Sequence, residues 1–339
     1  MGRILVLSLM NFSEAQLDKL RAVSPRLEVQ QIAEAAFDEL PQRVRDETEI
    51  LYGWSGAVRE AHHFPRLKWL QTHSAGIDYL TADPLWQQEQ IAITSLNGVH
   101  AVPMAEYTLA VMLGFRWRLP HMLRLQDKQT WVKDRWKTFI FPELRGSTLG
   151  IVGYGAVGRE LARQAQALGV EILAVNHSGR RSPYRGFSEP GLGDPTATIP
   201  TEIFATTALL HMLPQCDYVV ILAPLTPETH HLFGAEAFAA MKDSAFLVNL
   251  ARGGLVDEAA LIEALQNGQI AGAGLDVFET EPLPSDSPLW NLDNVIISPH
   301  VAGFTTLYDD RATDLFAENL RRYLHQESLL NLVEREKGY

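Results

Sequence analysis

The chain contains 339 residues, of which 46% are hydrophobic and 21% are charged. These proportions are typical of a folded globular protein, and the length allows about two domains. A formal net charge of −12, without any run of basic residues, argues against nucleic acid and anionic membranes as partners. The single cysteine, Cys216, cannot form an internal disulfide, and no apolar stretch is long enough to span a bilayer, so we expect a cytoplasmic protein.

Residues 1–100 alternate short apolar runs with helical segments, which predicts a parallel sheet covered by helices. Ser13 and Gln16 form a capping-box pattern at the start of the first helix, and Pro25 follows its end. The expected strands are 4–9, 27–32, 49–53, 67–72 and 91–95.

The fourth of these strands ends in three small residues, Ser74, Ala75 and Gly76, whose backbone N–H groups are expected to be accessible. Ligands bind to α/β folds at the carboxyl ends of parallel strands, although a tight turn without a ligand explains the pattern equally well. A long apolar helix follows Pro103 and is expected to lead into a second domain. The polar and aromatic segment 126–141 either packs on the surface or forms an arm that reaches a second subunit.

A second alternating series begins at Thr148 and predicts another parallel sheet. Residues 179–200 are rich in Gly, Pro, Ser and Arg and predict a long surface loop. A helix over 257–267 has Asp257 as its N-cap and Gly268 as its stop, and the last helix, 305–325, follows the final strand and is positioned to return to the first domain. The expected strands are 148–153, 171–176, 218–223, 246–250, 271–276 and 295–298.

The first strand of this series runs into the sequence GYGAVG at 153–158, and an alanine-rich helix follows. In this strand–turn–helix context the glycine pattern indicates a dinucleotide site. Gly153 permits the tight turn, Gly155 lets the backbone approach a pyrophosphate, and Gly158 lets the helix pack closely. The alternative is a glycine-rich turn that binds nothing.

The end of the second strand bears on the choice of cofactor. NAD-binding sites place an acidic residue about 20 residues beyond the glycine pattern, but neutral Asn176 stands 23 residues after Gly153 (176 − 153). A carboxylate would repel a 2′-phosphate, whereas an amide, a hydroxyl and two guanidinium groups would hold one. The segment therefore predicts NADP(H) in preference to NAD(H), unless the arginines only solvate a loop. Its candidate residues are Asn176, His177, Ser178, Arg180 and Arg181.

Three polar residues follow later strands of the second series: Arg252, Glu281 and His300. Arg252 offers a planar pair of donors for a carboxylate, Glu281 offers an acceptor, and His300 offers an acid or a base. Each alone has a structural explanation, as a surface ion pair, a loop charge or a structural histidine. The adjacent pairs His62-His63 and His230-His231 lack the spacing of metal ligands, and we expect no metal.

Five ordered signals together make the chain resemble the D-isomer-specific 2-hydroxyacid dehydrogenase family over essentially its full length. The resemblance implies two α/β domains with parallel sheets, Rossmann-like or flavodoxin-like, with the active site in the cleft between them. A cofactor domain, 101–304, would be inserted into a split substrate domain, 1–100 plus 305–339, and homodimers would form through the cofactor domains. The signals are SAGID at 74–78, PMAE at 103–106, GYGAVG at 153–158, NLARG at 249–253, and Asp276 with EP at 281–282 and SPH at 298–300.

The motif match also implies roles for single residues. Arg252, Glu281 and His300 would be catalytic, and residues 74–76 would bind the substrate carboxylate together with Arg252 and His300. Asp276 would lie near the nicotinamide amide. The residues expected to contact the cofactor are Gly153, Tyr154, Gly155, Ala156, Val157, Gly158, Asn176, His177, Ser178, Arg180, Arg181, Ala223, Pro224, Thr229, Leu250, Ala251, Arg252, Asp276, His300, Ala302 and Gly303.

The implied reaction is the reversible reduction of a 2-oxo acid to a D-2-hydroxy acid by NAD(P)H, with NADPH preferred and a substrate of the glyoxylate or hydroxypyruvate type or a broader range. His300 would protonate the carbonyl oxygen, Glu281 would orient its ring, and Arg252 would clamp the carboxylate. Glu281 argues against the formate-oxidising branch, which has Gln there, and Asn176 departs from the usual Asp. Two alternatives stay open: a bulkier 2-oxo acid, and a non-catalytic NAD(P)-sensing protein similar to transcriptional corepressors.

Overall fold

The computed structural model describes residues 2–54 and 61–338. The chain forms two compact units: the first comprises Met1–His100, Arg185–Ser188 and Thr305–Tyr339, and the second Ala101–Tyr184 and Glu189–Phe304. The expected domain ranges did not anticipate that residues 185–188 leave the second unit. No helix in the described part of the chain is long and apolar enough to cross a membrane.

The first unit contains a five-stranded parallel sheet with the strand order β2-β1-β3-β4-β5. This is the flavodoxin-like order. The predicted capping box is confirmed, because Ser13 Oγ accepts from the Gln16 N–H and the Gln16 side chain accepts from the Ser13 N–H. The elements are β1 (Ile4–Ser8), α1 (Glu14–Ala22), β2 (Leu27–Gln31), α2 (Gln42–Glu47), β3 (Thr48–Gly53), β4 (Trp69–Thr72), β5 (Ala92–Thr94) and the 3-10 helices Glu34–Glu39, Ala61–His63, Asp78–Leu80 and Pro84–Gln87.

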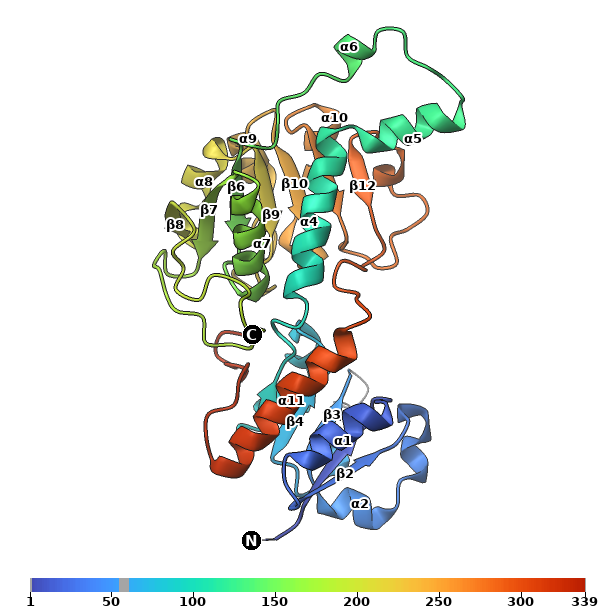
Figure 1. The fold of residues 1–339 in the computed structure, drawn as a ribbon, viewed down its shortest axis with the longest axis vertical. Helices are drawn as coiled ribbons and strands as arrows, with labels where there is room; N and C mark the ends of the chain where they lie inside the picture. Colours follow the sequence, from blue (N-terminus) through green and yellow to red (C-terminus); the bar gives the residue numbers. More distant parts are fainter. Residues whose placement is uncertain (1, 55–60, 339) are drawn as a thin grey trace. The chain divides into compact units, whose positions relative to one another are not determined.

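One face of this sheet is covered by α1 and by α11 (Tyr308–His325), which lie side by side (Figure 1). An ion pair between Lys19 and Asp314 at 2.6 Å joins the two helices. Leu20 and Phe316 are buried beneath them against the sheet. The last helix of the chain therefore completes the core that the first hundred residues begin.

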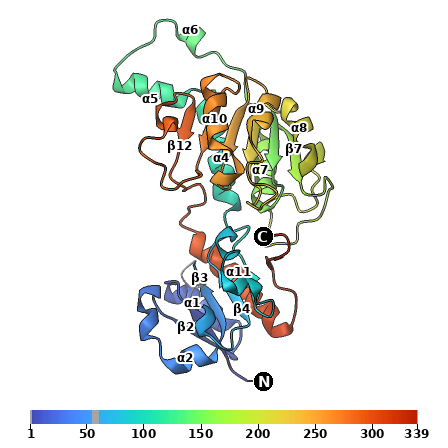
Figure 2. The ribbon, with the colours of Figure 1, turned by 180° about the vertical axis from the view of Figure 1, so that it is seen from behind.

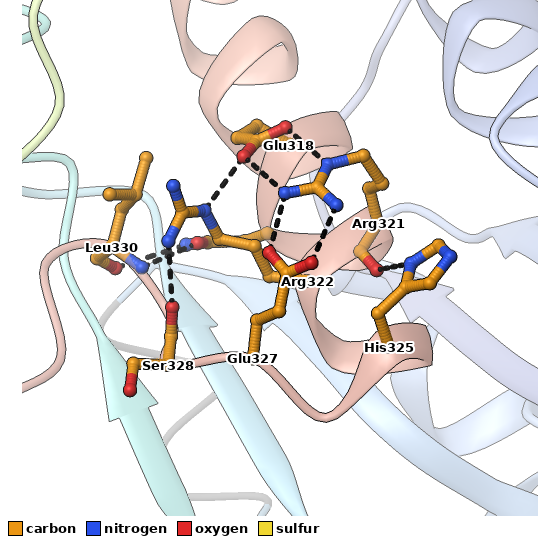
Figure 3. A network of polar contacts seen from close by, with 8 residues as sticks. Glu318, Arg321, Arg322, His325, Glu327, Ser328 and Leu330 are labelled. Carbon is orange, nitrogen blue, oxygen red and sulfur yellow. Dashed lines mark hydrogen bonds and ion pairs between the residues drawn. The ribbon is translucent and has the colours of Figure 1, made fainter.

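A network of charged side chains stabilises the last turns of α11 (Figure 3). Glu318 accepts hydrogen bonds of 2.7–2.9 Å from Arg321 and Arg322, and Arg321 also pairs with Glu327 at 2.7 Å. The hydrogen bonds from Arg321 and Arg322 lower the pKa of Glu318 to about 2. These contacts lie where the helix ends and the chain turns at Gln326, which has a left-handed backbone (φ +58°).

The second unit contains a seven-stranded parallel sheet with the order β12-β11-β10-β9-β6-β7-β8. The order reverses at β6 (Thr148–Val152), which is where a doubly wound sheet binds its ligand. Six strands were predicted; β8 (Glu202–Ala205) was missed because it is a four-residue edge strand without a buried residue. The other elements are α7 (Ala156–Ala167), β7 (Glu171–Asn176), α8 (Leu209–Met212), β9 (Tyr218–Ile221), α9 (Ala235–Ala240), β10 (Phe246–Asn249), α10 (Glu258–Gln266), β11 (Gly272–Leu275), β12 (Val295–Ile297) and the 3-10 helices Thr206–Ala208, Leu213–Gln215, Gly253–Leu255 and Pro288–Asn291.

Helices cover both faces of this second sheet (Figures 1 and 2). On one face α4 (Ala101–Arg116) and α7 bury Met112 and Leu161. On the other face α8, α9 and α10 bury Met212 and Phe238, together with Cys216. Asp257 caps α10 by accepting from the Ala260 N–H at 3.0 Å, as predicted.

The segment after α4 belongs to the second unit but extends away from its sheet (Figure 1). α4 ends at Arg116, and Pro120 lies in the first turn of α5 (Leu119–Asp127). A loop with the one-turn helix α6 (Arg135–Thr138) follows. Trp131 and Trp136 are 82% and 70% exposed, so most of each indole surface is uncovered, although the Arg135 guanidinium lies 5.5 Å from the centroid of the Trp136 ring.

Residues 185–188 belong to the first unit because Phe187 packs there. Its ring lies against Leu96 and Val99, and its N–H donates to Asn331 Oδ1 at 3.0 Å. Its carbonyl oxygen would lie 2.2 Å from a Cβ on Gly98, whose φ of +96° also favours glycine. The predicted surface loop 179–200 is confirmed as irregular, but Phe187 in its middle packs into the first unit.

Candidate active site

The glycine turn after β6 has one open position. A Cβ on Gly153 would lie 2.5 Å from the Ala223 nitrogen, and one on Gly158 would lie 2.5 Å from the Gly153 oxygen, so both glycines serve close packing. A Cβ on Gly155 would meet no described atom within 4 Å. This open face lies at the N-terminus of α7, where helix N–H groups lack internal partners. The turn therefore fits the pyrophosphate of a dinucleotide.

The side chain of Tyr154 points into the protein, so only its backbone is available at this turn. The ring is 5% exposed, and the hydroxyl donates to Asp194 Oδ2 at 2.8 Å. Beside it, the buried guanidinium of Arg159 donates to the carbonyl oxygens of Asp194 (2.5 Å) and Ser182 (2.8 Å). These bonds fasten the loop 179–200 to α7.

The turn after β7 holds the residues expected to select the cofactor. Asn176 Oδ1 accepts from the N–H groups of Ser178 (3.1 Å) and Gly179 (2.7 Å), and its Nδ2 donates to the Arg180 carbonyl (2.9 Å). The Arg181 guanidinium donates to the Ala197, Pro200 and Thr201 carbonyls at 2.5–3.1 Å. Among the described residues, the exposed guanidinium of Arg180 has no hydrogen bond or ion pair. Asn176 and Arg181 thus shape the loop and Arg180 remains available.

Arg252 follows β10 on a turn that Asn249 closes. The buried Asn249 side chain accepts from the Ala251 N–H at 3.1 Å and donates to the Arg252 carbonyl at 2.9 Å. A Cβ on Gly253 would lie 1.9 Å from the Phe278 carbonyl carbon, so glycine is needed where this turn meets the chain after β11. The turn therefore places Arg252 beside the segment that leads to Glu281.

His300 and Glu281 form a direct pair. His300 Nδ1 lies 2.8 Å from Glu281 Oε2, and Glu281 Oε1 accepts from the Phe278 N–H at 3.1 Å. The two side chains are 49% and 36% exposed, so both remain accessible within this unit. Because β10, β11 and β12 are neighbours and parallel, Arg252, Glu281 and His300 all follow the same edge of the sheet.

Asp276 is 1% exposed, and its carboxylate accepts three hydrogen bonds from the chain around His300. The donors are Ser298 Oγ (2.5 Å) and the N–H groups of Val301 and Ala302 (2.9 Å each). The position of Asp276 near the nicotinamide stays a prediction. Its hydrogen bonds to the histidine loop could not be predicted from the sequence, because no spacing rule connects strand-end residues in space.

The segment expected to bind the substrate carboxylate lies in the first unit, after β4. Ser74 Oγ donates to the Gly76 carbonyl at 2.9 Å and shares a hydrogen bond with the Tyr79 hydroxyl. Within the described part of the chain, the N–H groups of Ala75 and Gly76 donate to no other residue. Two N–H groups in one half-buried turn suit an anion.

His73 precedes this turn and is buried. The Tyr52 hydroxyl lies 2.8 Å from its Nδ1, and Asp309 Oδ1 lies 3.5 Å from its Nε2. Burial, with a smaller effect from His100, lowers the pKa of His73 to about 4. His73 is therefore neutral at pH 7. In the described residues no cluster of three or more His, Cys, Asp or Glu is arranged for a metal ion, and the absence of a metal stays a prediction.

Comparison with known proteins shows which family this chain is similar to. Residues 109–302 match the family model described as "D-isomer specific 2-hydroxyacid dehydrogenase, NAD binding domain". A glyoxylate reductase from Thermofilum pendens is 35% identical over 303 residues, covering 88% of this chain and 85% of the relative.

Solved structures agree with the sequence comparison. A D-isomer specific 2-hydroxyacid dehydrogenase from Xanthobacter autotrophicus, in complex with NADPH and MES, superposes with a TM-score of 0.80 at 30% identity and covers 100% of both chains. An NADPH-dependent glyoxylate/hydroxypyruvate reductase from Sinorhizobium meliloti, in complex with NADP and sulfate, gives 0.79 at 26% identity and covers 99% of this chain and all of its own.

A doubly wound parallel sheet with an open glycine turn at its switch point, taken together with these relatives, identifies an NAD(P)-binding oxidoreductase of the Rossmann type. The chain belongs to the D-isomer specific 2-hydroxyacid dehydrogenase family. The matched region contains the glycine turn, Arg252, Glu281 and His300.

Proposed function

We propose that this protein reduces a 2-oxo acid to the D-2-hydroxy acid, with Arg252, Glu281 and His300 as its catalytic residues and with a substrate of the glyoxylate or hydroxypyruvate type or a broader range. The observation that carries the proposal is the His300–Glu281 pair at 2.8 Å, on the same sheet edge as Arg252. The relatives named glyoxylate reductase and glyoxylate/hydroxypyruvate reductase support this substrate class.

The mechanism follows from the hydrogen bonds of His300. When bound, the reduced nicotinamide supplies a hydride to the carbonyl carbon. Glu281 is an acceptor only, so the shared proton sits on His300 Nδ1, and Nε2–H of the protonated ring is free to donate to the carbonyl oxygen as charge develops there. In the oxidation direction Nε2 accepts that proton.

Arg252 and the turn at 74–76 are proposed to hold the substrate. The guanidinium matches a carboxylate with two parallel N–H donors and steadies the oxygen that gains charge. The N–H groups of Ala75 and Gly76 are proposed to bind the same carboxylate. Recognition by fixed donors orients the carbonyl before chemistry.

NADPH is the proposed cofactor, in preference to NADH. Asn176 is neutral, so the end of β7 carries no charge that repels a 2′-phosphate, and the available Arg180 is suited to bind one. The Ser178 hydroxyl lies on the same turn, where it donates to Asn176 Oδ1 at 3.4 Å and accepts from the Arg180 N–H at 3.3 Å. Two of the similar structures contain NADPH or NADP.

A homodimer is proposed to form through the second unit. The extended segment with α5 and α6 exposes Trp131 and Trp136, together with Leu123 (56%) and Ile140 (70%). Apolar side chains on an extended arm favour a protein partner. Sedimentation should give a dimer for the wild type and a monomer for a Trp131→Ser/Trp136→Ser variant; a monomeric wild type contradicts the proposal.

The cytoplasm is the proposed compartment, in agreement with one buried, unpaired cysteine.

The decisive experiment measures steady-state reduction of glyoxylate, hydroxypyruvate and phenylpyruvate, each with NADPH and NADH. We expect turnover with the first two and a higher kcat/KM with NADPH. Turnover restricted to phenylpyruvate would assign a bulkier acid. Tight NADPH binding without turnover of any acid would overturn the enzymatic proposal in favour of a nucleotide-sensing protein.

A further inference from the structure

His300 sits in a backbone conformation that needs support. Its φ is +56°, in the left-handed region that is sterically unfavourable for an L-residue. The chain on both sides is held by Asp276, through Ser298 before the histidine and through Val301 and Ala302 after it. The bonds to Asp276 therefore bracket the strained residue.

A residue from a distant part of the chain, Tyr107, extends this arrangement. The Tyr107 hydroxyl, on α4, forms a short hydrogen bond with Ser298 Oγ. The Ser298 hydrogen is directed to the Asp276 carboxylate, so its oxygen is left to accept from Tyr107. Burial raises the pKa of Tyr107, so the hydroxyl keeps its proton at neutral pH and remains a donor. The polar chain thus runs in one direction, from Tyr107 through Ser298 to Asp276.

We propose that Tyr107 is a positioning residue for His300: its hydroxyl fixes Ser298, and Ser298 with Asp276 holds the left-handed loop so that His300 Nδ1 stays against Glu281. This inference rests on the proposed function, because it assigns Tyr107 a role through the catalytic histidine. All the residues of this hydrogen-bonded series lie in the second unit.

A positioning role for Tyr107 predicts an effect on the orientation of His300 and none on binding. If Tyr107 positions the acid, its loss lowers the fraction of molecules with His300 correctly oriented and leaves binding of the cofactor and the 2-oxo acid unchanged. Removing one such hydrogen bond should lower kcat about tenfold. The pH limb of kcat should also move, because a smaller fraction of the molecules holds the imidazole against Glu281.

The test compares Tyr107→Phe, Ser298→Ala and Ser298→Thr with the wild type. We expect Tyr107→Phe to lower kcat about tenfold with KM and NADPH affinity within about twofold. Ser298→Ala should lower kcat similarly, and Ser298→Thr, which keeps the hydroxyl, should restore most of it. The double variant Tyr107→Phe/Ser298→Ala should have the same kcat as Ser298→Ala alone, because both changes interrupt the same series of hydrogen bonds.

Tyr218→Phe is the matched control. Tyr218 is buried, whereas Tyr107 is half-buried, and its hydroxyl likewise forms a hydrogen bond that involves α4, accepting from Arg116 Nε at 2.6 Å, but Tyr218 lies at the amino end of β9. Its loss should lower the thermal midpoint without changing kcat or its pH limb. Equal kinetics for Tyr107→Phe and Tyr218→Phe would overturn the inference.

Hydrogen exchange of backbone amides in the NADPH complex tests the inference without requiring turnover. The amides of Val301 and Ala302 should exchange about tenfold faster in Tyr107→Phe than in the wild type or Tyr218→Phe. Unchanged exchange overturns the inference even if the wild type reduces no 2-oxo acid. An inactive wild type with faster exchange in Tyr107→Phe overturns the proposed function alone.

Discussion

His300 contacts Glu281 through Nδ1, whereas the second unit contains another histidine–glutamate pair that uses the opposite ring nitrogen. His231 Nε2 lies 2.7 Å from Glu279 Oε1, and His300 Nδ1 lies 2.8 Å from Glu281 Oε2. Pairing through Nδ1 leaves Nε2, the ring atom far from the backbone, free to meet a substrate. Pairing through Nε2 occupies that atom. The His300–Glu281 pair is therefore the proposed reactive site, and the His231–Glu279 pair serves as its control.

Replacing His300 with Gln should remove most of the turnover. The amide cannot deliver a proton, so kcat should fall about 10²- to 10⁴-fold. NADPH affinity, measured by fluorescence titration, should stay within about threefold, because the cofactor is held chiefly elsewhere. His231→Gln removes the paired histidine at the other site and should retain wild-type kcat. A fully active His300→Gln enzyme would contradict the catalytic assignment.

Replacing Arg252 with Lys should damage both binding and chemistry. The charge remains but the planar pair of donors is lost, so we expect KM for the 2-oxo acid to rise about tenfold or more and kcat to fall. Initial rates over a range of substrate concentrations separate the two effects. Arg21→Lys, at an exposed ion pair with Glu14 on α1, controls for the exchange of residue type and should leave both constants unchanged.

The two adjacent arginines after β7 should respond differently to alanine. Arg180→Ala removes the available guanidinium and should weaken NADPH binding about tenfold or more with no change for NADH. Arg181→Ala breaks three bonds to loop carbonyls and should weaken both cofactors to a similar, smaller extent. Calorimetric titration with each nucleotide measures the contrast. A loss specific to NADPH in Arg181→Ala would reverse the two roles.

The buried His73 should make the first unit sensitive to acid. Its pKa is about 4 when folded and near 6.5 when unfolded, so the unfolded chain binds the proton more readily. The contribution to stability is complete above pH 6.5, is lost as the pH falls towards 4, and amounts to roughly 3 kcal/mol. Hydrogen exchange of the β3 and β4 amides between pH 7 and pH 4 reports this loss. His73→Gln should flatten the dependence, whereas exposed His325→Gln should not.

The sequence predicted those features that repeat with a fixed period or depend on local geometry. Alternating apolar runs predicted the two parallel sheets, and the Asp257 N-cap and the Gly153–Gly158 turn lie as expected. β8 was missed because a half-exposed edge strand carries little hydrophobic pattern.

What the sequence left undetermined depends on contacts between distant residues. Arg180 and Arg181 are adjacent and chemically identical, and only the folded loop shows that the second is already bonded. Tyr107 and Ser298 are 191 residues apart, and no local pattern connects them. The packing of Phe187 in the first unit could not be predicted for the same reason, since its hydrogen-bond partner Asn331 lies 144 residues away in the sequence.

The burial of Cys216 makes this protein well suited to site-specific labelling. Burial raises the pKa of its thiol to about 12, so the reactive thiolate is scarce at neutral pH. Since it is the sole cysteine of the chain, a second one introduced at an exposed position such as Trp131 or Ser182 would react alone with a maleimide. A fluorophore attached there would report on subunit association or on the cofactor loop without any prior removal of native thiols.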